Sequence, residues 1–306
     1  MLFSDGEAVD TIDCAGLSRL LIVNPMASAV TPARIRGVAN ALGEVQVVET
    51  ERPGHATELA REAAGRVEAL YVFSGDGGFN EVLNGIDATT PLGLIPGGGA
   101  SVLARALGAP RDPVVAATRL VGARRRRISL GRVNGRRFGF SAGVGLDAEL
   151  VRRVDRFGRT RDRGRAGNVK FAWTALRVLA EHRLTLEPVL EVRGHGRAAF
   201  ALAANCDPYT YAGRIPLHVA PLASFDDGLD VVGARRLTPG RFPRFLYYVV
   251  RGRGQVEAAD VLYAHDVDRV EVVCDRPLPL QADGEDLGDA DEVLLESERS
   301  AVTVLV

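Results

Sequence analysis

Apolar and polar residues follow one pattern over about the first 120 positions of the chain and another pattern after them. In the first part, short and almost continuous apolar runs alternate with longer segments of helical periodicity. The predicted strands are Arg19–Pro25, which ends in an Asn-Pro dipeptide, Val45–Thr50, Leu70–Ser74 and Leu92–Ile95, and the predicted helices are Thr31–Leu42, His55–Arg66, Phe79–Asn84 and Ser101–Leu107. Buried strands that alternate with helices predict a parallel sheet covered on both faces, and such sheets bind ligands at the carboxyl ends of their strands.

The second part begins after an arginine run at residues 124–127, and strand-like segments dominate it. The predicted strands are Ile128–Val133, Arg137–Ser141, Thr185–Val192, Ala198–Ala204, Leu229–Ala234 and Arg269–Cys274, and the predicted helices are Val169–Glu181 and Arg241–Arg251. Alternating strands of this kind are typical of antiparallel sheets. We therefore expect an α/β protein of two domains, with a boundary near residue 128.

The composition narrows the chemistry that this chain can perform. Its 306 residues include 34 glycines, and Lys170 is the only lysine among 38 basic residues. A Walker A loop requires Gly-Lys-Ser/Thr, which does not occur here. Any phosphate must therefore be bound by backbone N–H groups, arginine or a metal ion.

Charge and cysteine usage exclude further classes. The net charge of −1 argues against general nucleic-acid binding. Cys14, Cys206 and Cys274 form no C-x-x-C pair, so neither a disulfide framework nor a zinc site is indicated. The acidic N-terminus lacks the features of a signal peptide, and no apolar stretch reaches about 18 residues. We expect a cytoplasmic protein.

Two glycine-rich loops carry most of the chemical information. The first follows a predicted strand and opens a helix over Ser74–Val82, and the second does the same over Pro96–Arg105. Glycine lets a ligand approach the backbone closely, and the free N–H groups of a helix start favour an anion. Asp76 within the first loop suits a magnesium–nucleotide complex better than free phosphate. One such loop is explained equally well by a tight turn, but two in succession predict a nucleotide site.

These loops belong to a larger set of motifs. Asn24-Pro25, the two glycine loops and a late Asp283-Gly284-Glu285 occur in an order that resembles the catalytic domain of the diacylglycerol kinase and sphingosine kinase family of lipid kinases. The resemblance runs from about Arg19 to the C-terminus. The Gly-Asp-Gly signature alone is shared with NAD kinases and phosphofructokinases.

The resemblance implies an arrangement of domains and a nucleotide site. It implies an α/β ATP-binding domain over residues 1–128, an antiparallel β-sandwich for the lipid substrate over 129–294, and a return of residues 295–306 to the first domain. The residues that it implies for ATP binding are Asn24, Pro25, Thr50, Ser74, Gly75, Asp76, Gly77, Gly78, Asn80, Glu81, Gly98 and Gly99. Thr50 is equally well explained as an ordinary polar residue at a strand end.

Three carboxylates are candidates for the catalytic groups. Transfer of the γ-phosphoryl group of ATP to a lipid hydroxyl needs alignment, charge neutralisation and an acceptor for the hydroxyl proton. From the resemblance we expect Asp283 to be the base, with Glu285 as the second candidate and Asp76 near the metal or the substrate hydroxyl. Taken alone, the segment around Asp283 is better explained as a hairpin turn.

The resemblance also implies a structural Mg²⁺ site, held by Asp227 and the carbonyls of Ser224 and Leu229. Carboxylates and carbonyls are suitable magnesium ligands, although Asp-Gly turns are common without a metal. A second feature is the arginine cluster from Arg152 to Arg165, which could place the protein peripherally at the anionic inner membrane surface. A solvated basic loop explains the same cluster.

The sequence departs from the family pattern at the nucleotide site. Gly78 stands where a threonine is usual, and Gly98-Gly99, Ser101-Val102 and Ile128-Ser129-Leu130 replace segments that usually carry a hydroxyl or a carboxylate. The first hypothesis is an ATP- and Mg²⁺-dependent kinase of a diacylglycerol-like or sphingoid lipid. The alternatives are a kinase of a soluble substrate such as NAD and a catalytically weakened homologue that binds lipid or nucleotide. The sequence leaves open whether the protein forms an oligomer.

Overall fold

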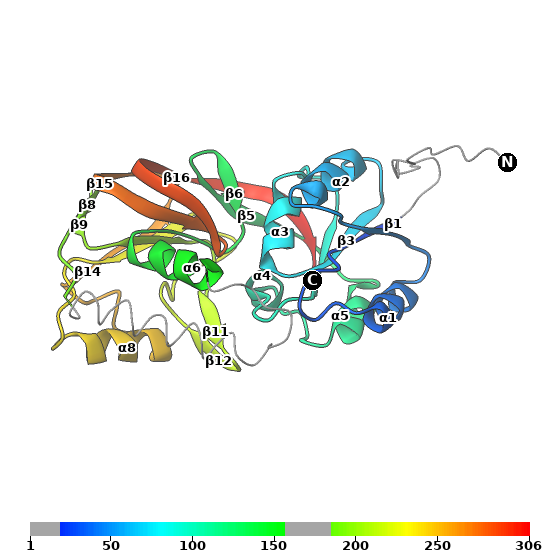
Figure 1. The fold of residues 1–306 in the computed structure, drawn as a ribbon, viewed down its shortest axis with the longest axis horizontal. Helices are drawn as coiled ribbons and strands as arrows, with labels where there is room; N and C mark the ends of the chain where they lie inside the picture. Colours follow the sequence, from blue (N-terminus) through cyan, green and yellow to red (C-terminus); the bar gives the residue numbers. More distant parts are fainter. Residues whose placement is uncertain (1–18, 157–184) are drawn as a thin grey trace.

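The computed structural model describes residues 19–156 and 185–306, and these form two regions along one long axis (Figure 1). The helices are α1 (Pro32–Leu42), α2 (His55–Ala63), α3 (Asp76–Leu83), α4 (Val102–Ala106), α5 (Pro113–Leu120), α6 (Leu146–Arg156) and α8 (Phe242–Arg251). The strands are β1 (Arg19–Val23), β2 (Gln46–Glu49), β3 (Ala69–Ser74), β4 (Leu92–Pro96), β5 (Arg125–Val133), β6 (Arg136–Phe138), β7 (Ser141–Val144), β8 (Leu190–Val192), β9 (Gly196–Ala198), β10 (Ala201–Ala204), β11 (Thr210–Ala212), β12 (Ile215–Leu217), β13 (Leu229–Ala234), β14 (Val261–Val267), β15 (Arg269–Ala282) and β16 (Glu285–Leu305).

The N-terminal region is a parallel sheet between two helix layers. Strands β4, β3, β1 and β2 are neighbours in that order and pair in parallel. Alternate residues of β1 face opposite layers: Leu20 and Ile22 pack with α2 and α3, whereas Leu21 and Val23 pack with α1 and α5. The expected parallel sheet covered on both faces is confirmed.

The C-terminal region is an antiparallel sheet with its own core. Strands β14, β13, β10, β7 and β15 follow one another antiparallel, and β8 pairs with β15. Residues such as Val144, Val231 and Val272 lie in a cluster separate from the cores of the first region. The two patterns of apolar and polar residues in the sequence therefore correspond to two different kinds of sheet.

The last strand joins the two regions. β16 follows a tight turn after β15, pairs with β5 over residues 295–298 and 302–305, and reaches β4, where Val304 is the parallel partner of Leu92. In Figure 1 it runs as the red ribbon from one half of the molecule into the other. The expected boundary at residue 128 falls inside β5, which belongs to this shared ladder, and the boundary itself stays a prediction.

Local signals predicted some elements closely and missed others. Thr31 caps α1 by accepting a hydrogen bond from the Arg34 N–H, and Pro32 occupies its first turn, as expected. In contrast, α3 begins at Asp76 rather than Phe79, because its two glycines continue the helix instead of forming a loop. The segment α5, the helix α6 and the strand β16 were not predicted. The predicted helix Val169–Glu181 lies outside the described residues.

Candidate functional site

The two glycine loops meet at one edge of the parallel sheet. They follow β3 and β4, which are neighbours, and the Gly97 N–H donates to the Ser74 carbonyl at 2.7 Å. A Cβ built on Gly98 would lie 2.8 Å from the Gly75 Cα, so the backbones touch where no side chain fits. Glycine is required here by close approach rather than by a turn. The expectation that both loops share one sheet edge is confirmed.

A cavity of about 180 Å³ opens beside the first loop, between β1, β3, α2 and α3. Five of the predicted nucleotide residues line it, namely Asn24, Thr50, Ser74, Gly78 and Glu81. Two of the other predicted residues do not line it: Gly99 lies outside the lining, and Asn80 donates a hydrogen bond to Asp283 of the C-terminal region instead. The structure therefore brings five of the predicted residues together at one cavity, and their role in binding a nucleotide stays a prediction.

One departure from the family pattern has a structural explanation in this cavity. A Cβ on Gly78 would lie 2.8 Å from the Ser74 Cβ and closer still to its hydroxyl oxygen. Ser74 is 1 % exposed, and its Oγ has no hydrogen-bond partner among the described residues. The Ser74 hydroxyl thus occupies the space that a side chain at position 78 would need. The structure therefore places the Ser74 hydroxyl close to where the hydroxyl of a threonine at position 78 would lie.

Asp76 caps the neighbouring helix. Its Oδ1 accepts a hydrogen bond from the Leu103 N–H at 3.3 Å, at the start of α4. Burial raises the pKa of Asp76 to about 6, and the charge of Asp283 adds to the rise, whereas the N–H groups of Val102 and Leu103 oppose it. A carboxyl with such a pKa changes protonation near neutral pH. This makes Asp76 a group that is able to exchange a proton during a reaction.

Asp283 is enclosed by donors. Its carboxylate accepts hydrogen bonds from the Gly139 N–H at 2.6 Å, the Phe140 N–H at 2.9 Å, the Ser141 N–H at 3.2 Å and Asn80 Nδ2 at 2.9 Å. The residue is 4 % exposed. Burial raises its pKa, and these four hydrogen bonds oppose the rise. Both oxygens of the predicted base are committed to the protein, and one of the bonds ties the C-terminal region to α3.

The same residue forms the turn between β15 and β16. Asp283 and Gly284 both have positive φ values, +49° and +78°, and Ala282 pairs with Glu285. This is the geometry of a two-residue hairpin of type I′, for which Asp-Gly is a preferred sequence. The turn and the buried carboxylate are therefore two roles of one residue.

Glu285 lies on the accessible side of this turn. Its carboxylate pairs with Arg136 of β6 at 2.5 Å, and the Glu285 side chain is 28 % exposed. A Cβ on Gly77 would lie 2.9 Å from Glu285 Oε1, so the carboxylate sits directly over the first turn of α3. Glu285 and Arg136 line a second cavity of about 350 Å³, which shares Pro53 and Glu81 with the first.

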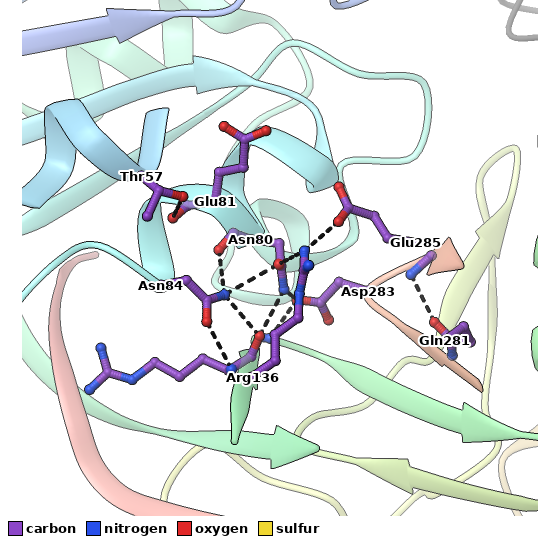
Figure 2. A network of polar contacts seen from close by, with 11 residues as sticks. Thr57, Asn80, Glu81, Asn84, Arg136, Gln281, Asp283 and Glu285 are labelled. Carbon is purple, nitrogen blue, oxygen red and sulfur yellow. Dashed lines mark hydrogen bonds and ion pairs between the residues drawn. The ribbon is translucent and has the colours of Figure 1, made fainter. Parts of the chain in front are cut away.

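Figure 2 shows how the polar residues of α3 connect these parts. Asn80 Oδ1 accepts from Arg136 Nη2 at 2.8 Å, and Asn80 Nδ2 donates to Asp283. Asn84 exchanges hydrogen bonds with the backbone of residue 137, and Thr57 donates to the Glu81 carbonyl at 2.8 Å. Sequence reasoning missed Arg136 and Asn84. The i, i+4 spacing of two asparagines in a helix with apolar neighbours is the signal that marks the second of them.

A further buried network lies behind the turn. Asp147, at the start of α6, accepts hydrogen bonds from the Tyr209 hydroxyl and from Gln281 Nε2, and Gln281 Oε1 accepts from the Gly284 N–H at 2.9 Å. Burial raises the pKa of Asp147. These residues were also missed, because the segments that carry them lie far apart in the chain.

The structure describes the predicted metal ligands and the first part of the arginine cluster. Ser224 and Asp227 lie in one turn, where the Asp227 N–H donates to the Ser224 carbonyl at 3.2 Å, and Leu229 begins β13. Among residues 19–156 and 185–306 no three His, Cys, Asp or Glu side chains gather as a metal site would require. Arg152 pairs with Asp286 and Asp289, and positions 157–165 of the cluster lie outside the described residues.

Comparisons with known proteins agree with this geometry. Residues 18–133 match the diacylglycerol kinase catalytic domain, and residues 141–306 match the YegS C-terminal NAD kinase beta sandwich-like domain. A diacylglycerol kinase of Bacillus subtilis (strain 168) is 30% identical over 251 residues, which cover 79% of each chain. This chain belongs to the diacylglycerol kinase-like family of lipid kinases.

Solved structures of Bacillus anthracis str. Sterne proteins share the fold of this family member. A diacylglycerol kinase aligns with a TM-score of 0.70 at 19% identity, covering 95% of this chain and 97% of the other. A second structure from the same strain aligns with a TM-score of 0.73 at 21% identity, covering 94% of this chain and 96% of the other. The fold is thus an N-terminal nucleotide-binding α/β domain followed by a β-sandwich-like domain. Family membership indicates a kinase whose acceptor is a hydroxyl group.

Proposed function

We propose that this protein transfers the γ-phosphoryl group of ATP to the hydroxyl of a diacylglycerol-like lipid. The observation that carries the proposal is the pair of adjoining cavities: one lies at the glycine loop, and the next contains Glu285 and Arg136. A donor and an acceptor bound in adjoining cavities are held in the geometry that phosphoryl transfer needs. The diacylglycerol kinase of B. subtilis supports the lipid class of the acceptor.

The nucleotide side of the site relies on backbone groups. No lysine lies among the residues that line either cavity, and the start of α3 offers N–H groups at the end of a helix. These groups and the helix dipole attract the phosphates. Asn24, Thr50 and Ser74 supply polar side chains for the rest of the nucleotide.

The contacts favour Glu285 over Asp283 as the base. The two carboxylate oxygens of Asp283 accept hydrogen bonds from four protein donors, whereas the Glu285 side chain is partly exposed and lines a cavity. In the proposed step Glu285 takes the proton of the lipid hydroxyl while the oxygen of that hydroxyl forms a bond to the γ-phosphorus of ATP. The bond between the γ-phosphorus and the oxygen that bridges it to the β-phosphate breaks, and ADP is released. Arg136 orients Glu285 and offers positive charge beside the transferred group. Asp283 positions the turn that carries Glu285.

Mg²⁺ bound with the nucleotide would neutralise charge on the phosphates. Asp76 is the carboxylate nearest to the glycine loops in sequence and is the candidate to hold it. The turn with Ser224, Asp227 and Leu229 offers one carboxylate and two carbonyls, a donor set that suits Mg²⁺ in kind. We keep both metal sites as proposals, together with a cytoplasmic location and peripheral contact with the inner membrane surface. The described residues contain no helix long and apolar enough to cross a bilayer.

Purified protein should phosphorylate diacylglycerol with labelled ATP in the presence of Mg²⁺, and Glu285→Gln should lower kcat about 10²- to 10⁴-fold because it removes a general base. Glu292→Gln is the matched control, because Glu292 is an exposed carboxylate of the same strand β16. Transfer to NAD but not to lipid would contradict the proposed acceptor. Binding of lipid or nucleotide with no transfer to any hydroxyl would identify a non-catalytic homologue.

A further inference from the structure

Helix α8 presents apolar residues on both of its faces. Phe242, Phe245 and Tyr248 face inward and pack against the C-terminal region, including Leu237 and Val261. This inner face alone is sufficient to attach the helix. A surface helix usually turns charged or polar residues outward, opposite such a face.

The outer face of α8 is apolar instead. Leu246, Tyr247 and Val250 are 53 %, 52 % and 42 % exposed, and their spacing of one and four residues places them on one side of the helix. Pro243 is exposed on the same side. Contiguous exposed apolar residues of this kind mark an interaction surface rather than an ordinary solvated helix.

The hairpin β11–β12 lies beside α8 and also exposes an apolar side chain. The His218 N–H, which follows β12, donates to the Val249 carbonyl of α8 at 2.7 Å, so hairpin and helix are attached to each other. Ile215 of β12 is 56 % exposed. In Figure 1 α8 lies at the periphery of the C-terminal region, beside β11 and β12.

The charged residues in and directly after α8 are all basic. From Arg241 to Arg253 the sequence contains four arginines and no acidic residue. Arg241 and Arg244 pair with Asp260, whereas Arg251, Arg253 and the hairpin residue Arg214 are exposed and form no ion pair with any described residue. The last three arginines are thus available to a negatively charged partner.

We propose that the outer face of α8, together with the hairpin tip, is the surface by which this protein docks on an anionic phospholipid bilayer. Apolar residues between unpaired cations are the pattern that binds helices in the plane of a membrane interface. Arginines near an anionic surface attract it electrostatically, and a tyrosine suits the headgroup level. The proposal rests on the proposed function for its purpose, since a membrane-embedded lipid is reached only from the bilayer surface. It places the membrane contact on α8 rather than on Arg152, which is already paired with two aspartates.

Co-sedimentation with vesicles tests the surface. The full-length protein should bind phosphatidylcholine vesicles that contain phosphatidylglycerol more tightly than vesicles without it, and added salt should weaken binding. Leu246→Glu/Val250→Glu should lower the partition coefficient at least tenfold, and Arg251→Gln/Arg253→Gln about thirtyfold, which corresponds to about 1 kcal/mol per arginine. The controls are Val115→Glu/Val121→Glu and Arg36→Gln/Arg66→Gln, which change exposed residues of the N-terminal region by the same chemistry.

The outcomes separate the surface from the reaction. Phosphorylation of a short-chain, water-soluble diacylglycerol should be unchanged in the α8 variants. If the wild type transfers no phosphate but its vesicle binding depends on α8, the proposed function fails and the surface stands. Vesicle binding that is unaffected by both pairs of α8 substitutions would overturn the surface. So would a Leu246→Glu/Val250→Glu variant that turns a dimer into a monomer without a change in vesicle binding, because α8 would then be an interface between two copies.

Discussion

The two sides of α3 are built from the same helix but differ in how far their polar groups are satisfied. On one side, Ser74 and Gly78 border a cavity, and the buried Ser74 hydroxyl has no partner among the described residues. On the other side, Asn80 and Asp283 belong to a network in which each carboxylate oxygen accepts two hydrogen bonds.

This difference distinguishes a binding surface from a structural joint. A buried polar group without a partner is costly, and a ligand that supplies the partner recovers that cost. A saturated network offers a ligand nothing but fixes the elements that share it. One side of α3 is therefore suited to receive the nucleotide, and the other holds the C-terminal region in place beside it.

We expect the largest effect on stability when the Asp283 carboxylate is removed from the hydrogen-bonded side of α3. Asp283→Ala leaves three backbone N–H groups and the Asn80 amide without their acceptor, and we expect the free energy of unfolding to fall by about 3 to 5 kcal/mol. Urea denaturation would measure it. Asp226→Ala is the control: it breaks an exposed ion pair with Arg126 and should cost less than about 1 kcal/mol. Equal losses in the two variants would mean that the network does not join the regions.

An intermediate effect should come from the pH dependence of Asp76. Its pKa in the folded protein is about 6, above the ordinary aspartate value of 3.8, so the folded state favours the protonated form. This contribution is complete below about pH 4 and is lost as the pH rises through 6. Asp76→Asn should therefore gain stability relative to the wild type between these two pH values, by up to about 3 kcal/mol.

Urea denaturation at pH 4 and pH 7 would measure the Asp76 contribution. A difference between variant and wild type that stays constant across this range would show that the pKa of Asp76 is not raised. Groups that lie far from Asp76 titrate equally in both proteins and cancel in the comparison.

The smallest expected effect concerns the cavity side of α3. Gly78→Thr should cost about 1 to 3 kcal/mol, because its Cβ meets the Ser74 side chain. Ser74→Gly should relieve this cost in the double variant and give a coupling energy above about 0.5 kcal/mol. ATP affinity, measured by calorimetry, should fall in Ser74→Ala and recover in Ser74→Gly/Gly78→Thr, in which a hydroxyl is present again. Additive effects on stability would contradict the shared volume.

Local sequence signals predicted the N-terminal region in most respects. The cap at Thr31, the apolar runs of β1 and β3 and the glycines that directly follow β3 and β4 are features of adjacent residues, and the structure confirms them. The start of α3 was placed three residues late, because glycine weakens a helix in isolation. In the folded protein both helical glycines lie where a Cβ would meet another side chain, Gly77 against Glu285 and Gly78 against Ser74.

Local sequence patterns predicted less of the C-terminal region and of the roles of the carboxylates. Strand β16 carries many charged residues, and pairing with β5 and β15 stabilises it more than its own pattern does. Arg136 gave no signal because it is one of 37 arginines. The predicted ligands Asp227, Ser224 and Leu229 remain predictions, as does the arginine cluster beyond residue 156.

The sequence by itself determined that two glycine loops follow parallel strands, because strand and helix alternate along the chain and each turn is made by neighbouring residues. It also determined that no P-loop lysine takes part. Only the tertiary structure decided which acidic group is enclosed and which faces a cavity. Asp283 and Asn80 are 203 positions apart, and burial and hydrogen bonding between such distant residues arise only when both regions are folded together. The same packing placed the Ser74 hydroxyl in the volume left by Gly78, four residues later.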